Sequence, residues 1–154
     1  MADALSRPDR ILRLLAWPAA IWIAYELTWY QQFKLTGNEG SVHLFTILSD
    51  WLGTPGGEQP FRLFVAILEI FCAVLVLIPR TRMIGAALSL GTMGGAIFFH
   101  VVSPLGIDPY GDGGALFKEA VFTFFCAGFI LYAHRAEAFA LLAVLRARLL
   151  PAAA

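Results

Sequence analysis

Four long apolar stretches constrain the fold of this chain more than any other feature of its sequence. The hydrocarbon core of a bilayer is about 30 Å thick, so a helix needs roughly 20 mostly apolar residues to cross it. Stretches of this kind occupy residues 11–30, 61–78, 83–102 and 115–133. We therefore expect an all-α fold, an integral membrane four-helix bundle that forms a single domain over residues 1–154.

The composition supports a membrane location. Apolar and aromatic residues make up 59% of the chain and charged residues 14%, whereas soluble domains have about 45–50% and about 25%. A chain of 154 residues exposes too much surface to bury that much apolar area in water. Eleven basic and eleven acidic residues cancel, so no net field would hold a nucleic acid. An ordinary soluble domain, a disordered chain and a nucleic-acid-binding module are therefore excluded.

The cysteines and the acidic loop residues do not predict a metal site. Cys72 and Cys126 lie singly in apolar runs, without a C-x-x-C pair or a zinc-type spacing. We interpret them as small apolar filler, although their similar depth leaves open that the two thiols approach each other and are redox active. Asp108 and Asp112 lack the order of a calcium loop, and turn chemistry explains them better.

The basic residues predict the orientation. Eight of the eleven flank the predicted spans on one side, where the positive-inside rule places the cytoplasm. Both termini are then cytoplasmic, and the first apolar run is an uncleaved helix rather than a signal peptide. These eight residues are Arg7, Arg10, Arg13, Arg80, Arg82, Arg135, Arg146 and Arg148.

Two further helices are expected outside the bilayer core. Residues 41–52 carry apolar side chains at helical spacing, which predicts a short helix on the outer face with Trp51 among the headgroups. Residues 136–150 are apolar but contain Arg146 and Arg148, and they are too interrupted to span. We interpret that segment as a C-terminal interfacial helix on the cytoplasmic face, with its arginines toward anionic lipids.

Small residues repeat along the third span. Ala87, Gly91 and Gly95 lie four residues apart and so share one helix face. Such a stripe lets two helix backbones approach closely, which favours a packing seam. The seam would join helices within one chain or form a homo-oligomer, and the sequence leaves both open.

The ionisable residues in and beside the spans are the strongest indication of a functional site. Inserting a charged side chain at the bilayer centre costs about 2.5–3.5 kcal/mol on insertion scales, so such residues are rare there and often functional. Placed by the predicted topology, they all fall in the outer half of the bundle, and every span contributes to them. The candidate ligand-binding residues are Glu26, Lys34, Arg62, Glu69, His100, Lys118 and Glu119.

Glu69 and His100 are the candidates for handling protons. Glu69 follows Arg62 by seven residues, so the two share a helix face and Glu69 lies about 10 Å deeper. Its side chain is too short to reach the headgroups, and we expect it to face the bundle interior, paired with a cation or carrying a raised pKa. His100 is either a proton relay or a satisfied histidine near the interface. We expect His43 to lie on the surface.

The other candidates allow simpler explanations. Lys34, Arg62, Lys118 and Glu119 each lie within about a turn of an interface, where long side chains reach the headgroups and pair with one another. Glu26 lies one turn from two aromatic residues, which form either a pocket or an interfacial aromatic belt.

A series of short strings runs through the chain in a specific order. They are Phe33-Lys34-Leu35-Thr36-Gly37; Pro60-Phe61-Arg62 with Glu69; Ile78-Pro79-Arg80-Thr81-Arg82 before Gly85-Ala86; Gly94-Gly95-Ala96 before His100; and Gly111-Asp112-Gly113-Gly114 before Leu116-Phe117. Their order and spacing resemble the DoxX-like family of small membrane proteins, roughly from the first span to the fourth. The resemblance implies a multi-pass four-helix bundle of the bacterial inner (plasma) membrane. It also implies an association with thiosulfate:quinone oxidoreductase and with redox or thiol stress.

Two functional hypotheses follow. The first is a quinone-linked oxidoreductase subunit, in which a quinone head-group enters from the lipid between aromatic walls. It accepts hydrogen bonds from Lys34, Arg62 or His100, with Glu69 passing protons. No metal, flavin, haem or dithiol motif is evident, so a redox partner protein would supply the electrons. The second is a non-enzymatic bundle that binds a lipid or a small anion, or assists the assembly of other membrane proteins. Whether the chain is an enzyme stays open at this point.

Overall fold

The computed structural model describes residues 7–137 and 139. Within these residues the fold is entirely helical, and the spans at residues 11–30, 61–78, 83–102 and 115–133 are confirmed as helices to within about a turn. The helices are α1 (Arg7–Trp29), α2 (Gln31–Thr36), α3 (Glu39–Trp51), α4 (Glu58–Leu77), α5 (Arg82–Val102) and α6 (Ala115–Ala133).

Among the described residues, four segments are long and apolar enough to cross a membrane: Asp9–Thr36, Glu58–Leu77, Arg82–Val102 and Ala115–Ala133. Much of their outer surface consists of exposed large apolar side chains, as a lipid environment permits. The chain is therefore a helical bundle of the multi-pass membrane type. The predicted helix at residues 136–150 lies almost wholly outside the described residues.

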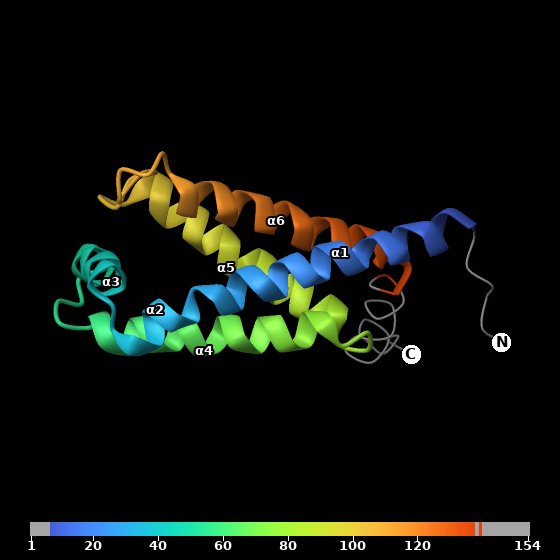
Figure 1. The fold of residues 1–154 in the computed structure, drawn as a ribbon, viewed down its shortest axis with the longest axis horizontal. Coiled ribbons are helices and arrows are strands. Elements are labelled where there is room, and N and C mark those ends of the chain that lie inside the picture. Colours follow the sequence, from blue (N-terminus) through green and yellow to red (C-terminus); the bar gives the residue numbers. More distant parts are fainter. Residues whose placement is uncertain (1–6, 138, 140–154) are drawn as a thin grey trace, which may run out of the picture.

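The four spanning helices pack in the ring order α1, α4, α5, α6, so that each packs mainly against two neighbours, and α1 and α5 also touch across the ring. Figure 1 shows α5 beside α6 and α1 beside α4, with the two pairs separating toward one end. Helix α3 lies at that end and packs against α4. We call this the α3 end; the start of α1 and the end of α6 lie together at the opposite end (Figure 1).

The connection between α1 and α3 follows from two local signals. Gly37 adopts the left-handed conformation (φ 68°) that ends α2, and the side chain of Asn38 accepts a hydrogen bond from the Gly40 backbone N–H (3.1 Å) at the start of α3. The segment predicted to be helical at residues 41–52 is helical in the structure as α3, and its position on the outer face stays a prediction. Its inner face is buried, whereas α2 was not expected from the sequence.

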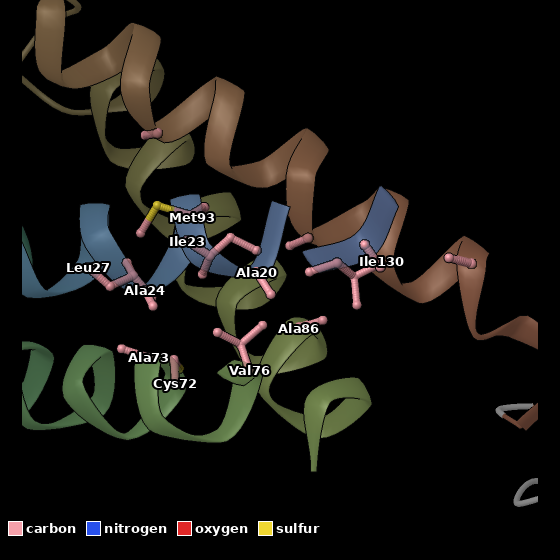
Figure 2. Close-up of a cluster of buried hydrophobic side chains, with 14 residues drawn as sticks. Ala20, Ile23, Ala24, Leu27, Cys72, Ala73, Val76, Ala86, Met93 and Ile130 are labelled. Atoms are coloured by element: carbon pink, nitrogen blue, oxygen red, sulfur yellow. The ribbon is translucent and has the colours of Figure 1, made fainter. Parts of the chain in front are cut away.

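Small side chains form much of the core. Figure 2 shows this cluster, to which all four spanning helices contribute. Small residues let helices approach closely where no water is available to drive association. Cys72 lies within the cluster, Cys126 packs against it, and both are free thiols, as expected for filler. The fully buried alanines are Ala16, Ala20, Ala66, Ala86 and Ala127.

The small-residue stripe does not form a seam within the chain, which corrects one of its two interpretations. Ala87 and Gly91 are exposed, and no heavy atom lies within 4 Å of where a Cβ on Gly91 or Gly95 would be. The close helix contact is at Gly85 instead, where a Cβ would lie 2.4 Å from the backbone nitrogen of Val76 in α4. Association between two chains through the stripe stays a prediction.

The loop between α5 and α6 is a hydrogen-bonded turn, as its composition predicts. The Asp108 carboxylate accepts from the backbone N–H groups of Asp112 (3.0 Å) and Gly113 (3.2 Å). The Asp112 carboxylate accepts from Gly114 and Ala115 (both 3.0 Å), which satisfies free N–H groups at the start of α6.

Asp108 makes the stability of this loop depend on pH. Some desolvation raises the pKa of its carboxyl group, but backbone N–H groups of the turn outweigh this and hold the pKa below its ordinary value. The stabilisation is thus present above the unfolded pKa of about 3.9 and is lost as the pH falls through the folded pKa. We expect Asp108→Asn to lower the thermal unfolding midpoint at pH 7, and to lower it less near pH 3, which is below the unfolded pKa. Asp50→Asn, at an exposed position in α3, is the control; an equal Asp108→Asn deficit at both pH values would contradict this account.

Candidate ligand-binding site

A cavity of about 220 Å³ lies toward the α3 end of the bundle. Residues from all six helices line it, and most of the lining side chains are apolar or aromatic. Polar side chains contribute a smaller part of the wall. They are Glu26, Tyr30, Lys34, Glu69, Thr92 and His100. The cavity is therefore amphipathic, which suits a ligand with an apolar body and a few polar groups.

A buried ion pair forms part of this wall. Glu69 is only 5% exposed, and its Oε2 atom forms an ion pair with the Lys34 ammonium group. Gln31 donates a second hydrogen bond to the same oxygen (2.7 Å) and another to the Leu27 carbonyl. The Gln31 Oε1 atom is buried and has no partner among the described residues. Glu69 thus faces the interior and pairs with a cation, as predicted from its depth.

Arg62 lies behind this pair rather than on the cavity wall. Its guanidinium group pairs with Glu58 one turn earlier in α4 and donates to the Lys34 backbone carbonyl. It also covers Gly37, where a Cβ would lie 3.6 Å from the guanidinium. Arg62 therefore ties the end of α2 to α4 and positions Lys34, and its predicted contact with a ligand stays untested.

Three carboxyl groups gather around one ammonium group. The Tyr30 hydroxyl donates to Glu119 (2.5 Å), which links the junction of α1 and α2 to α6. Glu26 is buried and interacts electrostatically with Glu119, Glu69 and Lys34. A small anion would meet three carboxyl groups here and one ammonium group, and that ammonium group already pairs with Glu69.

On the cavity wall, His100 has a polar atom that is unpartnered within the described residues. The residue is 4% exposed, its ring lies edge-on to Phe117, and its Nδ1 atom is 2.6 Å from the Gly106 carbonyl oxygen. A carbonyl only accepts, so Nδ1 carries the hydrogen and Nε2 of the neutral ring is an acceptor. Within the described part of the chain, Nε2 has no hydrogen-bond partner.

The remaining predicted residues lie farther from the cavity. Lys118 is exposed and does not line the cavity. Glu119 does not line it either, but it accepts a hydrogen bond from Tyr30, which does. His43 lies on the surface, as expected. Tyr30 lines the cavity beside Glu26, in agreement with the pocket interpretation of the aromatic residues around Glu26. Gln31 was not among the expected site residues, and its signal was a polar amide at the end of a mostly apolar span.

Helix α3 covers the cavity at its own end. Phe45 is buried and meets Phe61 of α4 edge-on, with ring centroids 5.3 Å apart. Phe61 meets Phe99 of α5 (6.1 Å), and Phe99 in turn meets Trp51 of α3 (6.0 Å). This aromatic cluster joins α3, α4 and α5 where the two helix pairs separate, and three of its rings, those of Phe45, Phe61 and Phe99, line the cavity.

The site can thus hold a partly polar group between aromatic and aliphatic walls, with one free imidazole nitrogen and one buried ion pair. Comparisons with protein families, with curated proteins and with solved structures find no match for this chain.

Proposed function

We propose that the chain is a DoxX-like protein of the bacterial inner membrane that binds an isoprenoid quinone in this cavity, as one subunit of a redox system. The observation that carries the proposal is the amphipathic cavity, in which buried His100 and the Lys34–Glu69 pair share a wall with aromatic side chains. A quinone combines a flat ring that bears polar oxygens with a long apolar tail. Both termini would lie in the cytoplasm, as the positive-inside rule predicts.

The residues present fit such a ring. The free Nε2 atom of neutral His100 would accept a hydrogen bond from a quinol hydroxyl, and when protonated it would donate to a quinone oxygen. The Lys34 ammonium group has three hydrogens, and those that Glu69 does not use can be donated into the cavity. Glu69 and His100 would hold and release protons, while the bound quinone would supply the redox chemistry. A partner protein would supply the electrons.

A second candidate function is lipid binding without catalysis, in a structural or assembly role. The pairing of the polar groups with one another favours this alternative. Lys34 forms an ion pair with Glu69, and Tyr30 donates a hydrogen bond to Glu119. Groups paired in this way stabilise the bundle without any reaction. The excess of carboxyl groups argues against the small-anion form of this hypothesis.

Retention of small molecules by the gently purified protein tests the proposal. We expect mass spectrometry to find a quinone enriched in the unmodified protein, and about tenfold less of it in His100→Ala, because one hydrogen bond to a buried group is worth about 1.4 kcal/mol. His43→Ala, at an exposed histidine, should retain the full amount. A retained phospholipid in place of quinone would contradict the redox proposal and support the lipid-binding alternative.

The proton role of Glu69 has a separate test. Glu69→Gln keeps the shape of the side chain and an acceptor for Gln31, but it cannot release a proton at neutral pH. We expect this variant to retain quinone and to lose quinone-dependent electron transfer in membranes that contain the partner. Unchanged electron transfer would exclude the proton role.

A further inference from the structure

We infer that the ligand enters this cavity sideways from the hydrocarbon core of the membrane, through an opening at Gly91 and Gly95 of α5. We infer further that its apolar tail stays in that opening. The ligand class is therefore a tailed membrane lipid and not a water-soluble solute. This inference rests on the proposed binding site. It adds the route by which the ligand enters and the requirement for an apolar tail.

The α5 wall has a gap where side chains are missing. Among the described residues that line the cavity, Gly91 alone is exposed, and Gly95 beside it is half-buried. No heavy atom lies within 4 Å of the position of a Cβ on either glycine. Gly91 lies midway along α5 (Arg82–Val102), at a depth where a spanning helix is surrounded by lipid tails. The exposed part of the wall therefore faces hydrocarbon.

At the α3 end of the cavity, none of the described lining residues is exposed. Phe45 and Leu48 of α3 are buried and line the cavity there. Leu105, in the loop between α5 and α6, is also buried and lines the cavity together with His100. The rings of Phe45 and Trp51 in α3 pack against Phe61 of α4 and Phe99 of α5.

The length of the cavity leaves room for a tail. Gly91 and His100 both line the cavity and are nine residues apart in α5, which is about 13 Å along the helix axis. Nine residues are two and a half turns, so the two positions lie on opposite faces of α5 and the cavity passes around its side. His100 is 4% exposed, and its unpartnered Nε2 atom marks the polar end. Near Gly91 the wall is formed by Met93, Ala96 and Thr92, whose hydroxyl is already used by the Leu88 carbonyl (2.9 Å). A polar group at His100 therefore leaves an apolar passage that a hydrocarbon chain would fill.

Two benzoquinones with the same ring test this inference, one carrying a decyl chain and one carrying none. We expect the unmodified protein to bind the decyl compound more tightly in a native mass spectrometry titration. Gly91→Leu should weaken that binding by about tenfold or more, because a side chain would occupy the space of several methylene groups. Ala87→Leu is the matched control, since it adds similar bulk one turn away on the same exposed helix face, outside the cavity. Unchanged unfolding midpoints would show that both variants fold.

The outcomes separate the inference from the proposed function. Equal binding of the two compounds, or unchanged decyl binding in Gly91→Leu, would overturn the lateral entrance while leaving the quinone site intact. If the unmodified protein binds neither compound but retains a phospholipid, the quinone proposal fails, and loss of that phospholipid in Gly91→Leu alone would still support the entrance. If it binds neither compound and retains no lipid, both are overturned.

Discussion

Replacing Lys34 with methionine is expected to lower the free energy of unfolding by about 3 kcal/mol or more, because it leaves the Glu69 carboxylate buried without its cation. The side chains of Lys34 and Glu69 are 15% and 7% exposed, so water offers little compensation. Gln31 would remain as a hydrogen-bond donor to the carboxylate, but it carries no charge. The measurement is the unfolding free energy in mixed micelles titrated with a denaturing detergent.

The double variant Lys34→Met/Glu69→Gln is the control for this effect. It removes both charges and keeps an acceptor for Gln31, so it should be more stable than the sum of the single changes predicts, by about 1 kcal/mol or more. Strict additivity of the two single changes would show that the pair contributes nothing specific to stability.

Gly85→Ala is expected to have the other large effect on stability, a loss of about 2–3 kcal/mol. A Cβ at this position would lie 2.4 Å from the Val76 nitrogen and 2.7 Å from the Leu75 carbonyl carbon, both of which belong to the α4 backbone. Backbone atoms cannot move aside as a flexible side chain does, so α4 and α5 would have to separate near the turn that joins them. Thermal unfolding in detergent measures the loss.

Gly91→Ala provides the matched control, since it makes the same change in the same helix. No heavy atom lies within 4 Å of its Cβ position, so the substitution should be neutral or slightly stabilising, because alanine favours a helix by about 1 kcal/mol over glycine. Similar losses at Gly85 and Gly91 would contradict the difference in packing that the structure assigns to them.

Much of the architecture follows from local properties of the chain. The spans are set by their length and hydropathy, and α3 by its apolar spacing together with Asn38 at its start. The inward orientation of Glu69 follows from the cost of exposing a short charged side chain to lipid. Each of these depends on one segment and its solvent, so no knowledge of the tertiary contacts was needed.

Two arginines show where this reasoning ends. Arg82 was interpreted as a charge in a cytoplasmic loop, yet it is 3% exposed, donates to the Val76 carbonyl (3.1 Å) and lies 3.8 Å from the centre of the Trp17 ring. Arg62 holds the end of α2 and is not on the cavity wall. Each arginine donates to a backbone carbonyl that a turn of the chain brings close, that of Lys34 for Arg62 and that of Val76 for Arg82. Every residue has such a carbonyl, so the sequence does not show which one an arginine will meet.

The glycines of α5 illustrate the same division. The sequence by itself determined the apolar spans, the membrane setting and the gathering of ionisable residues toward one end, because hydropathy and helix length act on each segment separately. Only the tertiary structure decided that Gly85 is a helix contact while Gly91 and Gly95 border a cavity, and that Lys34 is the partner of Glu69. Those outcomes depend on how two helix pairs converge at one end and separate at the other (Figure 1), which is a property of all the helices packed together.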